Sequence, residues 1–147
     1  MLSRAVLRFG RMVEFEGVNP ILRVRSVESS VEHYTNALGF ELQWGTPFFA
    51  CVARGKCALF LSQGDQGNEG AWVWIGVSDA SALHDEFVVS GVKIRHPPTN
   101  YPWAWEFQVE DPDGNVLRFG SESHEDEPYG EWLDMYGVRW DLGNTTE

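Results

Sequence analysis

The feature that most constrains the fold of this chain is an internal repeat. Residues 21–42 (ILRVRSVESSVEHYTNALGFEL) and 73–94 (VWIGVSDASALHDEFVVSGVKI) share one plan: an apolar strand, a serine-containing corner, an amphipathic stretch ending near glycine, and another strand. Such self-similarity indicates a duplicated supersecondary unit. Two further short apolar runs follow each copy, so the sequence predicts an α+β fold built from two βαβββ modules, at about 18–63 and 70–122.

Each predicted helix carries its own start and stop signals. Ser26 or Ser29 can cap the first helix and Ser78 or Asp79 the second, because short polar side chains accept hydrogen bonds from the free N–H groups of a first turn. Glycine ends both helices, at Gly39 and Gly91. The remaining strands are predicted at 40–45, 48–53, 57–62, 92–95, 103–110 and 115–120.

The stretch EDPDGN at 110–115 is a strong turn signal between two of these strands. A type I turn with a bulge at Gly114 sets the register of the hairpin, because loop length and turn type fix which residues face each other. In that register Val109 opposes Leu117, Phe107 opposes Phe119 and Gln108 opposes Arg118. The apolar face that should pack on the helices is then Trp103, Trp105, Phe107, Val109, Leu117 and Phe119.

Charge and length exclude several classes of protein. The chain has 147 residues, which suits one domain, and its 11 Lys+Arg against 22 Asp+Glu give a net charge of −11. That charge repels nucleic-acid phosphates and anionic membranes. No apolar run is long enough to span a bilayer, and the first 17 residues, interrupted by Arg8 and Arg11, lack a cleavage site for secretion. We therefore expect a cytoplasmic protein with no nucleic-acid or membrane partner.

The paired modules, the phrase TNALGF at 35–40 and the stretch EFQVEDPDGNVLRFGSE at 106–122 resemble the vicinal oxygen chelate superfamily, which includes glyoxalase, bleomycin-resistance proteins and extradiol dioxygenases. The ending is most similar to the bleomycin-resistance branch. The resemblance implies a half-barrel sheet with the helices on its outer face, and a homodimer with crevices at the interface. It covers one domain at 18–122 and leaves extensions at 1–17 and 123–147.

Metal-dependent members of that superfamily take ligands from the first and last strands of the modules. Carrying those positions over gives Asn19, Phe60, Trp72 and Arg118. One amide, two aromatic rings and a guanidinium do not supply the three or more converging donors that a divalent metal needs. We therefore expect no metal site and no cofactor.

The alternation of strand residues predicts a cavity wall opposite the helix-packed core. Phe60, Trp72 and Trp74 fall on that wall, whereas a sheet exposed only to water seldom carries such residues on its outer face. The Pro- and aromatic-rich segment 96–105 is predicted to be a stiff loop over the cavity or at a dimer contact, and brings in Trp103. The candidate ligand-binding residues are Asn19, Arg23, Phe60, Trp72, Trp74, Trp103, Glu106, Gln108 and Arg118.

Two functions from different classes fit this wall. The first is metal-independent sequestration of a cationic or aromatic molecule such as a bleomycin-like antibiotic, without catalytic residues. The alternative is an enzyme of the same superfamily, a lyase, isomerase or dioxygenase with a non-standard site, in which Glu106 would be the general base. Arg118 and Arg23 lie on the same sheet face and favour an ion-pair role for Glu106 instead. Glu106, Gln108 and Arg118 can also form a cross-strand polar ladder that only fixes the strand register. A regulatory or interaction module is a third class of function that stays open.

The tail from 121 to 147 contains eight acidic residues and one basic residue, yet it also carries Trp132 and Trp140. That apolar content exceeds what a solvating tail needs. We expect a short helix from about Pro128 to Gly137 that packs on its own domain or on a partner subunit. An acidic tail that gates the pocket is the alternative.

Overall fold

A computed structural model describes residues 12–134 and 136–143 of the chain. The first module contains one helix and four strands, which are β1 (Ile21–Arg23), α2 (Val27–Asn36), β2 (Glu41–Gly45), β3 (Phe49–Arg54) and β4 (Cys57–Ser62). The second repeats that order as β5 (Trp72–Gly76), α3 (Ala80–Val89), β6 (Lys93–Asn100), β7 (Trp105–Glu110) and β8 (Val116–Ser121). The predicted pair of βαβββ modules is confirmed.

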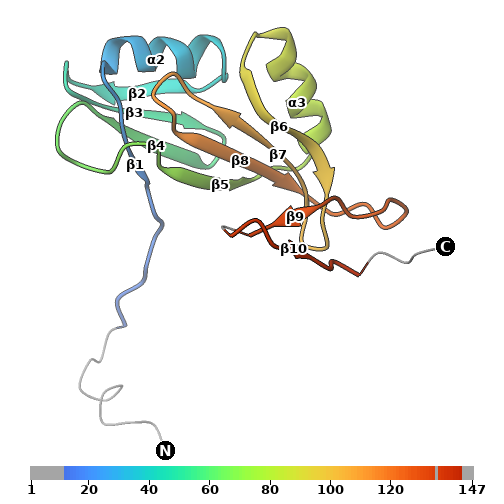
Figure 1. Ribbon diagram of the computed structural model, residues 1–147. Helices are drawn as coiled ribbons and strands as arrows, with labels where there is room; N and C mark the ends of the chain where they lie inside the picture. The colour runs from blue at the N-terminus through green and yellow to red at the C-terminus, as the bar shows by residue number, and fades with distance from the viewer. Residues whose placement is uncertain (1–11, 135, 144–147) are drawn as a thin grey trace, which may run out of the picture.

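The two modules also share one sheet topology. Their strand orders are β1-β4-β3-β2 and β5-β8-β7-β6, so the first and last strands of each module are neighbours. Those neighbours, β1 with β4 and β5 with β8, run parallel, and the other pairs are antiparallel. Both helices lie on the same side of the sheets, which leaves the opposite face uncovered by helix (Figure 1).

The helix boundaries follow the predicted caps. Ser26 accepts a hydrogen bond from the Ser29 N–H at 3.2 Å, and Asp79 accepts one from the Ala82 N–H at 3.0 Å. Each interaction satisfies one of the N–H groups that a first turn leaves free. Gly39 and Gly91 adopt φ angles of 73° and 78°, which glycine reaches without steric cost, and the chain leaves each helix there.

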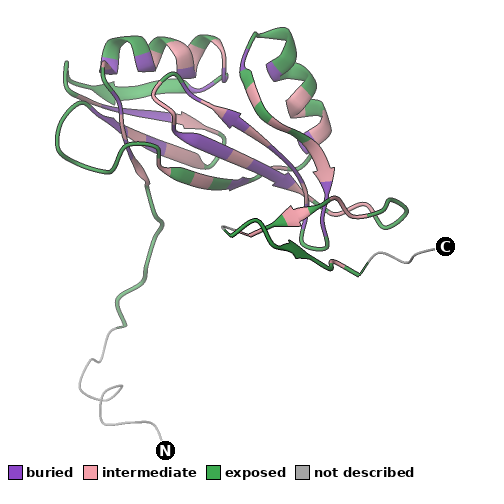
Figure 2. Cartoon of the chain, viewed as in Figure 1, coloured by how far each residue is buried: buried purple, intermediate pink, exposed green. Residues whose placement is uncertain are grey.

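The core lies between the helices and the apolar face of each sheet, shown as buried segments in Figure 2. Alternate strand positions point into it, as the alternation rule predicts. Tyr34 of α2 and Phe87 of α3 are its large helical members, at 0% and 1% exposure. The strand residues of this core are Leu22, Ala50, Val52, Leu59, Leu61, Ile75, Phe107, Val109, Leu117 and Phe119.

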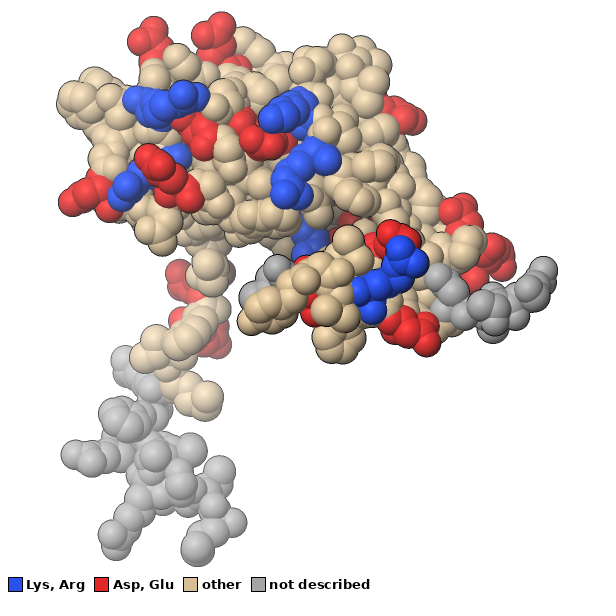
Figure 3. Space-filling model, viewed as in Figure 1, with Lys and Arg blue, Asp and Glu red and all other residues tan. Residues whose placement is uncertain are grey.

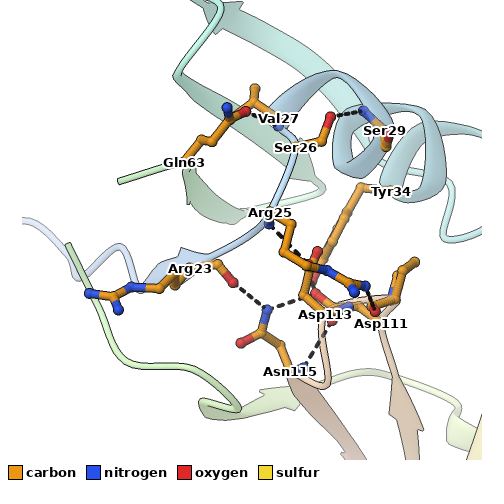
Figure 4. Close-up of polar contacts among 11 residues, drawn as sticks. Arg23, Arg25, Ser26, Val27, Ser29, Tyr34, Gln63, Asp111, Asp113 and Asn115 are labelled. Atoms are coloured by element: carbon orange, nitrogen blue, oxygen red, sulfur yellow. Dashed lines mark hydrogen bonds and ion pairs between the residues drawn. The ribbon is translucent and has the colours of Figure 1, made fainter. Parts of the chain in front are cut away.

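The DPDGN hairpin has the predicted register: Phe107 pairs with Phe119, Gln108 with Arg118 and Val109 with Leu117. Its turn also joins the two modules, which the sequence pattern did not predict (Figure 4). Asp111, 3% exposed, accepts a hydrogen bond from the Tyr34 hydroxyl at 2.9 Å across the module boundary. Asn115 donates to the carbonyl of Arg23 at 3.1 Å and to Asp111 at 2.9 Å. Burial, with Asp111 beside it, raises the pKa of Tyr34 well above its usual value.

The predicted loop at 96–105 is wrong for its first half, because β6 continues to Asn100. Pro97 and Pro98 lie in the strand, at shifts in its register with β7. Proline lacks an N–H to donate, and β6 tolerates it because it is the edge strand of its sheet. Strand β7 begins at Trp105, so Trp103 precedes it and does not join the helix-packed face.

The predicted helix at 128–137 is wrong. The tail forms a short antiparallel hairpin of β9 (Trp132–Leu133) and β10 (Arg139–Trp140). Asp134 accepts hydrogen bonds from the N–H groups of Tyr136 and Val138, at 2.8 and 3.0 Å, which stabilises a turn in place of a helix. These bonds and that of the Trp140 indole lower the pKa of Asp134. Residue 135 lies outside the described part of the chain, as do 1–11 of the N-terminal extension and 144–147 of the tail.

Candidate functional site

The sheet face opposite the helices carries large aromatic side chains that are about half exposed. Trp72 and Trp74 of β5 are each 53% exposed, and Trp44 of β2 is 51% exposed. Their strand neighbours Val73 and Ile75 point to the core, so alternation along β5 places both tryptophans outward. An exposed set of this kind on a water-facing sheet favours a binding surface.

A buried carboxylate organises the second-module part of this face. Glu106 of β7 is 2% exposed. Its Oε1 accepts the indole N–H of Trp74 at 2.9 Å and that of Trp103 at 2.8 Å. Its Oε2 accepts a hydrogen bond from Nε of Arg118 on β8 at 2.8 Å, and a terminal guanidinium nitrogen of Arg118 lies 2.7 Å from the same oxygen in an ion pair. We call these four residues, Trp74, Trp103, Glu106 and Arg118, the Glu106 cluster.

Strand register explains why these side chains meet. Trp74 pairs with Arg118 across β5 and β8, and Glu106 pairs with Gly120 across β7 and β8. Gly120 has no side chain, and this leaves space for the Trp74 ring. A Cβ at position 120 would lie 2.6 Å from the ring carbon Cζ2. A larger residue at position 120 would therefore displace Trp74.

The contacts of Glu106 favour positioning over proton transfer. Oε1 already accepts two indole hydrogen bonds, and Oε2 accepts one from Arg118, with which it also forms an ion pair. A general base must have a lone pair within reach of the substrate proton. Charge-assisted hydrogen bonds are the stronger class, so the cluster fixes the orientation of two indoles and one guanidinium.

A second contact holds Trp72. The Arg95 guanidinium of β6 lies 4.6 Å from the Trp72 ring centroid, within the range of a cation–π interaction. Arg95 also donates to the side-chain oxygen of Gln108 at 2.5 Å. Gln108 thereby orients Arg95 and, through it, Trp72.

In the first module, the aromatic side chains of the exposed face are held by contacts between their rings. Trp44 lies 5.8 Å from Phe49 and 5.5 Å from Phe60, and Phe49 lies 5.5 Å from Phe60, between ring centroids. These are normal separations for favourable aromatic pairs. Phe60 therefore belongs to a separate aromatic group on β2, β3 and β4.

Asn19 and Arg23 lie apart from the Glu106 cluster. The side-chain amide of Asn19 donates to the carbonyl of Ala58 at 3.2 Å. Arg23 lines a polar hollow of about 570 Å³ with Gln63 and Asp113. The structure thus groups the nine predicted residues into the Glu106 cluster, the Trp72–Gln108 pair bridged by Arg95, the Phe60 group, and these two on or before β1.

Several residues of the face were missed by the sequence prediction. Trp44 and Phe49 follow the same alternation as Phe60, so the pattern itself contained their signal. The sequence held no comparable signal for Arg95 and Trp132. The position of Arg95 depends on the bulged edge strand β6, and that of Trp132 on a tail that was predicted to be helical.

A hollow of about 540 Å³ also lies on the helix side, between the β3–β4 turn and α3. Arg54 and Glu86 of its lining form a two-pronged ion pair, at 2.7 and 2.9 Å. Hydrogen bonding by Arg54 lowers the pKa of Glu86. Because Arg54 and Glu86 neutralise each other, this hollow has fewer charged groups free to bind a ligand, and the aromatic face is the better candidate site.

The described residues contain no group of three or more His, Cys, Asp or Glu side chains that could hold a metal ion. Nor do they include a helix long and apolar enough to cross a membrane. The charged residues of one face, in both signs, are shown in Figure 3.

A family profile described as Glyoxalase/Bleomycin resistance protein/Dioxygenase superfamily matches residues 12–119. The chain belongs to this superfamily. The resemblance seen in the paired modules and in the stretch at 106–122 is therefore confirmed. Among proteins of curated function, none matches the chain.

Several solved structures share the fold. A bleomycin-binding protein from bleomycin-producing Streptomyces verticillus, crystallised with copper(II)-bleomycin, is 32% identical with a TM-score of 0.67, over 76% of this chain and 100% of that one. The antibiotic binding protein TnmS3 from Streptomyces sp. CB03234 is 22% identical with a TM-score of 0.66, over 76% and 100%. The bleomycin resistance determinant encoded on the transposon Tn5 is 19% identical with a TM-score of 0.65, over 74% and 98%.

Proposed function

We propose that this protein binds a flat, cationic small molecule, such as a bleomycin-like antibiotic, on its aromatic sheet face, with neither a metal ion nor chemical turnover. The Glu106 cluster is the observation that carries this proposal. It fixes two half-exposed tryptophans, Trp74 and Trp103, through hydrogen bonds to one buried carboxylate. Side chains already held in place lose little conformational entropy when a ligand stacks on them.

The charge of the protein suits a cationic ligand. The net charge of −11 attracts cations over distances longer than direct contact. At the surface, the faces of tryptophan rings attract cations and stack on planar groups. The bleomycin-binding protein that shares 32% identity and the antibiotic binding protein TnmS3 support an antibiotic-like ligand.

We further propose that the binding unit is a homodimer. Trp72 and Trp74 are each 53% exposed, so the face of one chain is an open platform. Small-molecule sites usually enclose most of the ligand surface. A second copy facing this platform would supply the opposite wall, and closed twofold pairs are the commonest soluble oligomers.

The test is a calorimetric titration of the protein with copper-free bleomycin, with and without EDTA. We expect saturable binding that EDTA does not change, and a loss of roughly tenfold or more in affinity for Trp74→Ala, because a central aromatic contact is removed. Val89→Ala is the control: that residue is 89% exposed at the end of α3, on the helix side of the sheets and away from the aromatic face. Its affinity should stay unchanged.

Two results would contradict the proposal. Binding abolished by EDTA would assign the ligand to a metal site. Equal affinity of Trp74→Ala and the unmodified protein would move the site away from the Glu106 cluster. Sedimentation gives the independent test of the dimer, which a stable monomer of 16.7 kDa would contradict.

A further inference from the structure

The C-terminal segment lies beyond residue 119, where the family profile ends, yet it is firmly attached to the domain. Its attachment point is Asn100, at the end of β6, which is 3% exposed. The side-chain amide of Asn100 donates to the carbonyls of His124 and Glu127, at 2.8 and 2.9 Å. Its side-chain oxygen accepts from the Ser123 hydroxyl and the His124 N–H, at 3.0 and 2.9 Å.

Further contacts continue this attachment along the chain. The His124 ring stacks on Trp105, with centroids 4.0 Å apart and planes 8° from parallel. The Gly130 N–H donates to the carbonyl of Asn100 at 2.8 Å. Gly130 passes so close to Thr99 that a Cβ there would overlap the Thr99 methyl group. Residues 123–130 therefore form a fixed strap that leads to β9.

The strap delivers Trp132 of β9 to the edge of the aromatic face. The Trp132 ring lies 5.4 Å from that of Trp103, nearly perpendicular at 87°, and 6.1 Å from that of Tyr101. The Arg118 guanidinium lies 5.5 Å from the Trp132 ring centroid. Trp132 thus contacts two members of the Glu106 cluster from outside the two βαβββ modules, and the hairpin sits at the β6 end of the second sheet (Figure 1).

We propose that the C-terminal hairpin is the end wall of the ligand site, and that Trp132 touches the ligand and restricts it to flat aromatic cations. This inference rests on the function proposed above. Trp103 already has Tyr101 stacked on it in parallel, with centroids 4.8 Å apart. Trp132 meets the same ring at a right angle, so the two indoles form a corner.

The shape and charge of this corner suit a flat aromatic cation. A flat ring lying along the platform can place its edge or face against Trp132, whereas a bulky non-planar group at that end collides with it. Arg118 beneath the corner is neutralised by Glu106 at 2.7 Å, so it does not repel a cation as a free guanidinium would. The wall is fixed by the Asn100 contacts, which distinguishes it from a tail that opens and closes over the site.

The experiment compares three variants with the unmodified chain, titrated by calorimetry with copper-free bleomycin and with proflavine, a planar cationic dye. Trp132→Leu keeps apolar bulk but removes the ring, and we expect roughly tenfold weaker binding of proflavine, the scale of one lost stacking contact. Trp132→Phe should recover part of that loss. Leu133→Ala is the control, because Leu133 is 53% exposed and alternates to the other side of β9; its affinity should not change.

A direct readout separates ligand contact from a structural role. Nuclear Overhauser effects between the proflavine ring protons and the Trp132 indole protons are expected in the complex, and near-ultraviolet circular dichroism checks that each variant keeps its fold. If Trp132→Leu binds both probes as tightly as the unmodified protein, the hairpin is not part of the wall, although the proposed function stands. If the unmodified protein binds neither probe, both proposals fall.

Discussion

The two modules share one topology but stabilise their exposed faces by different means. In the first module, Trp44, Phe49 and Phe60 contact one another through their rings. In the second, Trp74 and Trp103 are held by hydrogen bonds to the buried Glu106, whose charge is balanced by Arg118. Duplication therefore preserved the backbone plan while the outward positions diverged.

The difference separates two kinds of surface. Aromatic pairs accept several offset-stacked and edge-to-face arrangements, and the burial of their apolar surface is non-directional, so such a group can rearrange around a ligand. Charge-assisted hydrogen bonds fix both distance and angle. We therefore expect the second module to set which ligand binds, and the first to supply adaptable apolar contact.

The largest effect should come from breaking the polar anchor of the second module. Glu106→Ala leaves the Arg118 guanidinium, whose side chain is 22% exposed, without its ion-pair partner. Removing one member of a buried pair costs about 3 kcal/mol of unfolding free energy, discounted here to the low end for partial exposure. Urea unfolding measures this loss, and bleomycin affinity should fall with it.

Glu106→Gln sharpens that test, because the amide keeps the size of the side chain and one acceptor oxygen but loses the charge. Its stability should lie between those of the alanine variant and the unmodified protein. A Glu106→Ala variant as stable as the unmodified chain would show that the carboxylate does not organise the face.

A smaller effect is expected from the first module. Phe60→Ala removes a half-buried ring from the aromatic group, and should cost about 2 kcal/mol, below the range for fully buried phenylalanine. The measurement is again urea unfolding, with Phe60→Leu as a control that keeps most of the apolar volume. A loss larger than that of Glu106→Ala would reverse the proposed contrast between the modules.

The smallest effect concerns the connection between the modules. Tyr34→Phe removes the hydrogen bond to Asp111, at 2.9 Å, for a loss of about 1 kcal/mol near neutral pH. Because the pKa of Tyr34 is raised in the folded state, its contribution is complete below the usual tyrosine value of 10.0 and declines as pH rises above it.

Unfolding free energies from about pH 8 to about pH 11 measure this decline. The unmodified protein should lose stability more steeply above about pH 10 than Tyr34→Phe does. Equal slopes for the two proteins would contradict the assignment of this titration to Tyr34.

The sequence predicted the elements whose signals are local. Ser26, Asp79, Gly39 and Gly91 mark the helix ends because capping and positive φ depend on neighbouring backbone atoms. The register of the DPDGN hairpin was predictable for the same reason, since turn type fixes the pairing. Alternation then placed Trp72 and Trp74 on the outward face.

Local signals misled the prediction where contacts distant in sequence decide the outcome. The proline-rich segment from His96 became part of β6 because an edge strand needs no donor on its outer side. The tail became a hairpin because Asp134 bonds its own turn, and because Asn100, far back in the sequence, holds the strap that leads to it.

By itself, the sequence determined that this chain folds as two βαβββ modules with an apolar core and an aromatic outer face, because periodicity and caps act over a few residues. Only the tertiary structure decided that one buried carboxylate gathers Trp74, Trp103 and Arg118, and that Trp132 stands beside them. Those residues come from three strands, the segment before β7 and a tail hairpin, and they meet only when sheet register and long-range hydrogen bonds fix their positions.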